Sequence, residues 1–396
     1  MRTVLTAEKL WDGSSLINEP VIVAEDGRIA SISNRASAET SASGNERVHH
    51  YPGATLAPAF LDVHTHGAAG HDSMEGTPEA LRAIGAFLAR HGTANYLPTT
   101  VTASVDATLR AVEGIAKIIE NPALIGAGGA DERPVALPVG IHLEGPFLSH
   151  EKRGVHPPEL LLAPDIRLFD RFFEAARGHV RLMTLAPELP GAIELATHAT
   201  ARGVRISMGH SNATAAETRT CIAAGAVSAT HTFNAMRPLD HQELGILGTV
   251  LTNDSLYAEL ICDGIHVQPP AVKLWWRAKG PERAILITDA MTATGMPDGE
   301  YLLGGFPVQV ANGKATARGV LAGSVLTLDR ALANFVAFAG APVDQALRLL
   351  TSNPAAMTGL CDRAGSLAVG QPAHLVAVDS AGKLLTAIHN GEPVAA

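Results

Sequence analysis

The chain has 396 residues, 46% of them hydrophobic, which at roughly 100 to 200 residues per domain allows two or three domains and a large buried core. Charged residues make up 17% and the net charge is -9, a balance that repels a phosphate backbone, so we expect no nucleic-acid partner. Aromatic residues are only 4%, which argues against stacking platforms and aromatic-lined carbohydrate clefts and leaves polar recognition.

Cysteine usage and hydropathy predict a cytoplasmic protein without membrane contact. The three cysteines, Cys221, Cys262 and Cys361, lie far apart and form no C-x-x-C pair, which argues against a disulfide framework and a thiolate metal site. No run approaches 18 uninterrupted apolar residues. The 17 histidines are the unusual feature, because neutral imidazole is the commonest metal ligand.

The two ends of the chain carry short apolar runs separated by turn residues. In PVIVAEDGRIASIS, Asp26 and Gly27 predict a hairpin turn between two strands, and GSLAVGQPAHLVAVDSAGKLLTAIHNGEPV has the same character near the other end. We expect both ends to form one small β-sandwich domain. The predicted division is residues 1–58 for its first part, 59–345 for a central domain, and 346–396 for a C-terminal helix and the rest of the β domain.

The central domain alternates strand-like runs with helix-length segments, such as PEALRAIGAFLARHG and AAETRTCIAAGA. The eight predicted strands are FLDVHTHG, TANYLPTT, LPVGIHLEGP, VRLMTLAPE, VRISMGHS, AVSATHTFN, LYAELICDG and RAILITDAM. Eight βα units predict an α/β fold of the (β/α)8 TIM-barrel type, with a doubly wound open sheet as the alternative.

Polar residues collect at the ends of these strands, where the chemistry of a barrel lies, and they favour the barrel. They are His64, His66, Glu144, His210, His231 and Asp289. The H-x-H pair places two imidazoles on one strand face, and buried imidazoles and a carboxylate without a partner charge would be costly. We therefore expect a divalent metal, and this ligand set suits Zn²⁺, Fe²⁺, Mn²⁺ or Co²⁺ without choosing among them.

Asp289 follows the last strand, and we expect it to lie beside the metal as a general base. A carboxylate there would take a proton from an activated water and return it to a leaving amine. The alternative is a helix N-cap, and one residue can fill both roles.

Seven motifs follow one another over nearly the whole chain: DVHTHG, HLEGPF, GHSNAT, HTFNAM, DGIHV, TDAM and LAGS. In this combination the sequence resembles the amidohydrolase superfamily and, within it, the N-acetylglucosamine-6-phosphate deacetylases. The likeness includes the split β domain and the closing GSLAVGQPAHLVAVD. It implies a metal-dependent deacetylase that works as a homodimer.

The resemblance also implies roles for single residues. Glu144, His210 and His231 resemble the principal metal ligands of the family, and His64 with His66 resemble ligands of a second metal that only some members keep. VRLMTLAPE has no lysine that could be carboxylated to bridge two metals, which makes Glu144 the consistent bridge. The two further histidines that resemble substrate contacts are His156 and His266.

The sequence departs from the family at the group that binds the phosphate. Asn234 and Ala235 resemble residues that meet the sugar phosphate, but the family's H-R-E-P-G segment, whose arginine crosses a dimer interface, reads DHQELG here. Gln242 therefore stands in place of that arginine and carries no charge for a bidentate grip. Arg237 and Arg153 are candidate replacements.

From these observations we expect hydrolysis of N-acetylglucosamine-6-phosphate to glucosamine-6-phosphate and acetate, with one or two divalent ions per subunit. Zinc is the first expectation, with iron, manganese or cobalt as alternatives. Because of Gln242, a deacetylase of an unphosphorylated or different N-acyl amino sugar stays open, as does an N-acyl amino acid amidohydrolase. A catalytically idle sugar-binding relative would not need to keep every metal-binding residue and Asp289.

Overall fold

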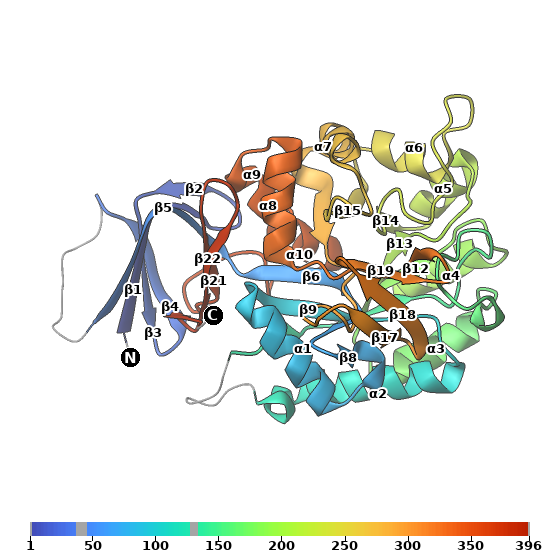
Figure 1. Ribbon diagram of the computed structural model, residues 1–396, viewed down its shortest axis with the longest axis horizontal. Helices are drawn as coiled ribbons and strands as arrows, with labels where there is room; N and C mark the ends of the chain where they lie inside the picture. Colours follow the sequence, from blue (N-terminus) through green and yellow to red (C-terminus); the bar gives the residue numbers. More distant parts are fainter. Residues whose placement is uncertain (1, 37–45, 127–133, 395–396) are drawn as a thin grey trace.

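The computed structural model describes residues 2–36, 46–126 and 134–394, which form a barrel and an adjoining sheet (Figure 1). The barrel carries the buried core of the central domain, and both chain ends lie in the adjoining sheet. None of the helices in the described part of the chain is long and apolar enough to span a membrane.

Eight parallel strands form the barrel, in the order β6 (Phe60–Thr65), β9 (Thr93–Thr100), β11 (Ile141–Glu144), β12 (Val180–Leu185), β13 (Arg205–Met208), β14 (Ala226–Ala229), β15 (Tyr257–Ile261) and β16 (Ala284–Ile287). β10 (Leu137–Pro138) adds to the side of β9. A parallel bridge between Thr65 and Ala290 joins the first strand to the segment after the last. The predicted barrel is thus confirmed, nearly closed, and the open sheet is excluded.

Helices cover the outside of the barrel, and four of the ten described α-helices begin at a side chain that caps the first turn. Thr77, Ser104, Asp165 and Thr214 each accept a hydrogen bond from a main-chain N–H of the first turn. The helices are α1 (Pro78–Arg90), α2 (Val105–Glu120), α3 (Ile166–Ala175), α4 (Ala192–Ala201), α5 (Ala215–Ala223), α6 (Gly245–Thr252), α7 (Pro269–Arg283), α8 (Leu328–Ala339), α9 (Val343–Arg348) and α10 (Ser352–Thr358), with 3-10 turns η1 (Ser73–Glu75), η2 (Pro122–Ile125) and η3 (Pro158–Leu160).

Strands from both chain ends form one mixed sheet, which confirms the predicted pairing of the ends. The order is β23 (Glu392–Pro393), β22 (Leu384–His389), β21 (Leu375–Val378), β5 (Arg47–Pro58), β1 (Arg2–Trp11), β3 (Pro20–Glu25) and β4 (Arg28–Asn34), with β2 (Leu16–Asn18) on β1. A bridge from Arg28 to Pro372 brings β4 back to the segment before β21. The sheet therefore curls around its own apolar core, which includes Leu5, Ile22 and Leu375.

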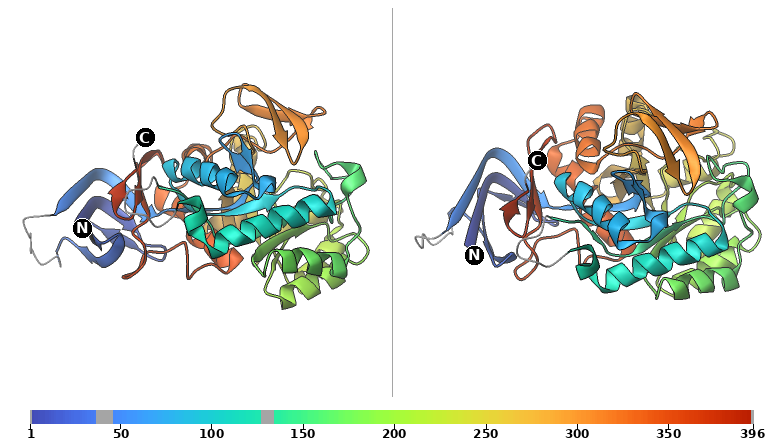
Figure 2. Two further views of the ribbon diagram at one scale, coloured as in Figure 1. Left: turned by 90° about the horizontal axis from the view of Figure 1, so that it is seen from below. Right: turned by 60° about the horizontal axis from the view of Figure 1, so that its bottom comes forward.

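A small antiparallel sheet that the sequence analysis did not foresee stands over the barrel (Figure 2). It consists of β17 (Gly299–Leu303), β18 (Phe306–Ala311), β19 (Lys314–Ala317) and β20 (Val320–Leu321), and we call it the lid sheet. Its apolar face packs on Met291 and Ala293, just after the last barrel strand. A short hairpin of β7 (Gly67–Ala68) and β8 (His71–Asp72) follows the first barrel strand.

Candidate active site

The predicted polar residues meet at the C-terminal end of the barrel. His64 lies in β6, Glu144 ends β11, and the other residues follow the strands after one or two positions. His210, His231 and Asp289 have positive φ values of 46°, 32° and 51°, because the chain turns sharply as it leaves each strand. A residue other than glycine is strained in this conformation, and strained residues are common at functional sites.

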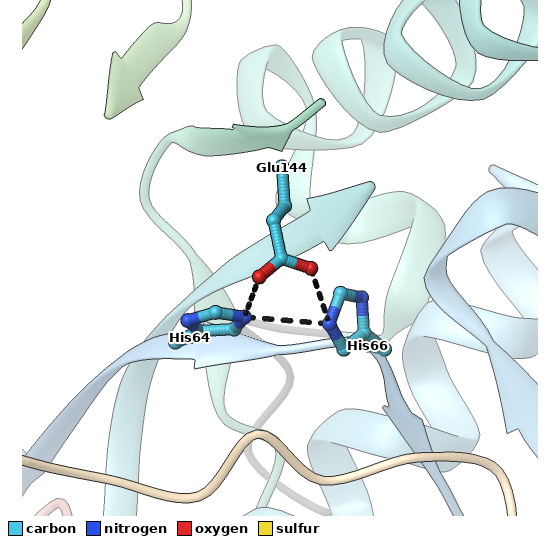
Figure 3. A group of neighbouring side chains, drawn as sticks. All are labelled: His64, His66 and Glu144. Carbon is cyan, nitrogen blue, oxygen red and sulfur yellow. Dashed lines mark hydrogen bonds and ion pairs between the residues drawn. The ribbon is translucent and has the colours of Figure 1, made fainter. Parts of the chain in front are cut away.

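The Glu144 carboxylate lies between two pairs of imidazoles. Its two oxygens lie 3.4 Å from His64 Nε2 and 3.3 Å from His66 Nε2 (Figure 3). Oε1 also lies 3.3 Å from His210 Nε2 and 3.1 Å from His231 Nε2. All five side chains are buried, so the carboxylate is the shared centre of the cluster.

Asp289 follows β16, the last strand of the barrel, and its carboxylate reaches the same cluster. Its Oδ1 lies 3.1 Å from His66 Nε2 and 3.4 Å from His64 Nε2. Its main-chain N–H donates to the His64 carbonyl at 2.9 Å, so its position is set by the first strand. A buried carboxylate is thus held beside the imidazoles that the sequence predicts as metal ligands.

The hydrogen bonds on the far side of the rings show that the cluster suits a cation. His66 Nδ1 lies 3.2 Å from the Thr99 carbonyl, and His210 Nδ1 lies 2.9 Å from the Lys152 carbonyl. A carbonyl oxygen only accepts, so these Nδ1 atoms carry a hydrogen and the Nε2 atoms face the cluster, where each can bind a cation once it has lost its proton. Two groups, His64 with His66 and Glu144, and Glu144 with His156 and His210, bring their donor atoms within 4.8 Å of one another.

The charges inside the cluster are strongly coupled. Burial alone would lower the pKa of His66, but hydrogen bonds to Asp289 and Glu144 outweigh it and raise this pKa to about 9. Burial would raise the pKa of Asp289, but His64 and His66 hold it at about 2. Against the same effect of burial, the charge of His64 also holds the pKa of Glu144 well below its usual range, so both carboxylates are ionised at neutral pH. The protons on His64 and His66 supply positive charge that a divalent cation would otherwise provide.

Three buried polar residues behind the cluster escaped the sequence analysis. Glu259 Oε2 lies 3.4 Å from His64 Nδ1. Asp62 accepts hydrogen bonds from Thr288 Oγ1 at 2.6 Å and from the His64 N–H at 3.2 Å, and burial raises its pKa to about 6. His142 Nε2 lies 2.8 Å from Thr184 Oγ1. These contacts brace the inner side of the cluster.

A cavity of about 500 Å³ opens above the cluster, between the barrel and the lid sheet. Among the predicted substrate contacts, it is lined by His156, His266, Asn234 and Ala235. Gln242 and Arg237, which the sequence also predicts as substrate contacts, do not line this cavity.

Two histidines of this cavity have one ring nitrogen fixed by a neighbour. His156 Nδ1 accepts the Thr102 main-chain N–H at 3.3 Å, and its Nε2 lies 3.5 Å from Glu144 Oε2. Burial, with the nearby His210, lowers the pKa of His156 to about 4. The ring is then neutral with its hydrogen on Nε2, the nitrogen that lies next to Glu144. His266 Nδ1 lies 2.6 Å from Asp263 Oδ2.

The chain is similar to known proteins over nearly its full length. The model of the amidohydrolase family matches residues 55–394. An N-acetylgalactosamine-6-phosphate deacetylase of Escherichia coli O157:H7 is 40% identical over 326 residues, 82% of this chain and 84% of that protein. An N-acetylglucosamine-6-phosphate deacetylase of Bacillus subtilis (strain 168) is 34% identical over 381 residues, 96% of this chain and 93% of that protein.

A solved structure shares the whole fold. It is a mutant N-acetyl-D-glucosamine-6-phosphate deacetylase from Mycobacterium smegmatis in complex with N-acetyl-D-glucosamine-6-phosphate. It is 33% identical, covers 100% of both chains and superposes with a TM-score of 0.89. The barrel, the terminal sheet and the lid sheet therefore belong to an architecture that is known to hold a phosphorylated amino sugar in that protein.

Proposed function

Since the chain belongs to the amidohydrolase family, as its motifs predicted, we propose that this enzyme removes the N-acetyl group from a 2-acetamido sugar 6-phosphate. The first candidate is N-acetylglucosamine-6-phosphate, which would give glucosamine-6-phosphate and acetate. The observation that carries this proposal is the placement of Asp289 and Glu144 among four histidines at the floor of a cavity wide enough for a sugar.

The cluster fits one or two divalent ions. Glu144, His210 and His231 would hold the principal ion, and His64 with His66 would hold a second one that Glu144 shares. Zn²⁺ suits this donor set, as do Fe²⁺, Mn²⁺ and Co²⁺. When bound, such an ion supplies Lewis-acid activation of the attacking water and of the acetyl carbonyl.

The protein's own groups would complete the reaction. Asp289, ionised and buried, would accept a proton from the attacking water and deliver it to the departing amine nitrogen. His156, neutral with its hydrogen on Nε2, would donate to the acetyl carbonyl oxygen as negative charge develops there. His266, Asn234 and Ala235 would contact the sugar and its phosphate, and the family resemblance implies a homodimer, which the molar mass in solution tests.

The sugar itself has two candidates, because the 40% identical relative is an N-acetylgalactosamine-6-phosphate deacetylase. We would measure acetate release by metal-reconstituted protein from both 6-phosphates and from plain N-acetylglucosamine, with kcat/KM for each. A preference of about a hundredfold for one 6-phosphate, about 2.7 kcal/mol, identifies the substrate. Equal rates with the plain sugar would contradict a phosphorylated substrate.

Replacing the general base tests the mechanism. Asp289→Asn keeps the shape of the side chain but cannot take a proton, so we expect kcat to fall by about 10²- to 10⁴-fold. The metal content should stay near that of the wild type, because all five predicted metal ligands remain. A metal-loaded variant with near-normal kcat would refute this role for Asp289.

A further inference from the structure

The residues first considered for the phosphate lie away from the cavity in this chain. Gln242 is exposed on the segment before α6, where its main-chain N–H donates to Asp240 Oδ1 at 2.8 Å. Arg237 Nε donates to Asn212 Oδ1 at 3.3 Å, and its side chain lies over Gly245. Neither residue offers a charge to a ligand inside the cavity of its own subunit.

A loop between β11 and η3 brings other cations to the cavity, and this loop is fixed against His210. The Lys152 carbonyl accepts from His210 Nδ1 at 2.9 Å, and the Ser149 N–H donates to the His210 carbonyl at 3.0 Å. Gly154 has a φ of 58° and lies so close that an added Cβ would be 3.3 Å from the His210 ring. The main chain of Lys152 and Arg153 is therefore held in place relative to the metal cluster.

Lys152 and Arg153 are the only lysine and arginine that line the cavity in the described part of the chain. Arg153 donates through Nη1 to the His150 carbonyl of its own loop at 2.8 Å, and neither side chain forms an ion pair with a described carboxylate. Guanidinium and ammonium groups retain their hydrogen-bond donors for a phosphate in such a position.

Electrostatics also require a local cation for an anionic substrate. The chain carries a net charge of -9, and the cavity contains the carboxylates of Glu144, Glu151 and Asp289. The proposed divalent ions would offset the charges of Glu144 and Asp289, but Glu151 and the net charge of the chain would still disfavour a phosphate dianion unless positive groups stood beside it. Resting on the proposed function, we propose that Lys152 and Arg153 bind the substrate's phosphate from the same subunit that holds the metal cluster, and so take over the task of the arginine that Gln242 replaces.

The test compares the wild type with Lys152→Met, Arg153→Met and the double variant. The substrates are the amino-sugar 6-phosphate that the wild type hydrolyses fastest and its unphosphorylated form. Each single variant should lower the ratio of the two kcat/KM values by about 10- to 100-fold, mainly through KM for the phosphorylated sugar, because a charge-assisted hydrogen bond is lost. Inhibition by inorganic phosphate should weaken by a similar factor.

Metal content and thermal midpoint should stay at wild-type values in these variants, since the bond to His210 uses the Lys152 main chain. Lys273→Met is the matched control, because Lys273 is exposed on α7 and does not line the cavity. If both cavity variants keep the wild-type ratio and phosphate inhibition, another group binds the phosphate and the assignment is wrong. A wild type that releases no acetate from any of these sugars would instead overturn the proposed function, and the assignment with it.

Discussion

Glu259, in the middle of β15, places a carboxylate in the interior of the barrel against His64. Its Oε2 lies 3.4 Å from His64 Nδ1, and its Oε1 has no hydrogen-bond partner in the described part of the chain. A fully buried carboxylate with so little compensation is costly by itself. In metal sites, a carboxylate on the far ring nitrogen orients the imidazole and raises its basicity, and the position of Glu259 suits this role.

Replacing this carboxylate should weaken metal binding. Glu259→Gln keeps the volume of the side chain but removes its charge, so we expect the affinity of the His64 and His66 site for Zn²⁺ to fall about 10- to 100-fold. Calorimetric titration of the metal-free protein measures this. Glu188→Gln is the control, because Glu188 accepts from Ser211 and Asn212 and contacts no predicted ligand. An unchanged Zn²⁺ affinity would show that Glu259 does not act through His64.

The polar residues at the ends of strands can be predicted from the sequence, because an apolar run precedes each of them. The polar residues inside the barrel were not predicted. Asp62 and His142 each lie two residues before a predicted ligand, on the same strand face, so the alternation that groups His64 with His66 also extends to them. Glu259 has no such signal, because the residues two positions away are Tyr257 and Ile261. Only the assembled barrel brings it to His64.

Among the elements, the lid sheet has clear local signals in the sequence, but it lies within the stretch that the repeating strand and helix pattern assigns to the barrel. Its hairpin turns contain Gly304 with Gly305 and Asn312 with Gly313, which are typical two-residue turns. The sequence analysis treated this stretch as part of the repeating βα units. Leu303, Val320 and Leu321 nevertheless line the cavity, so this sheet forms one wall of the candidate active site.

The turn between β17 and β18 sets how closely the lid sheet approaches the barrel. Gly304 has a φ of 56°, and an added Cβ would lie 2.1 Å from Cγ1 of Val101, which lines the cavity. Gly304→Ala should therefore push the turn away and lower kcat/KM about tenfold. Gly305→Ala is the matched control, because Gly305 also has a positive φ, 92°, but nothing lies within 4 Å of the added Cβ. Equal kinetic losses in both variants would attribute the effect to backbone strain alone.

Over the whole molecule, the candidate metal cluster lies where the barrel closes. Beside the bridge from Thr65 to Ala290, the His66 N–H donates to the Ala290 carbonyl at 2.7 Å. Local patterns locate all eight strands, but neither this closure nor the order of strands in the terminal sheet follows from them, because both depend on residues far apart in the chain. The division at residues 58 and 345 stays a prediction, and Trp11 of the terminal sheet packs into the core of the barrel.

Because predicted ligands in or just after β6, β11, β13 and β14 share this cluster, removing the metal should loosen the barrel as a whole. An ion that binds only the folded chain stabilises it by about 4.1 kcal/mol at a thousandfold excess over its Kd, so chelation should lower the thermal midpoint by roughly 5 °C or more and abolish turnover. Differential scanning calorimetry before chelation, after it and after Zn²⁺ is restored measures the shift. The Glu144→Ala variant has no shared carboxylate, so chelation should lower its thermal midpoint much less. If chelation leaves the midpoint of the wild type unchanged, metal binding at the cluster does not stabilise the barrel.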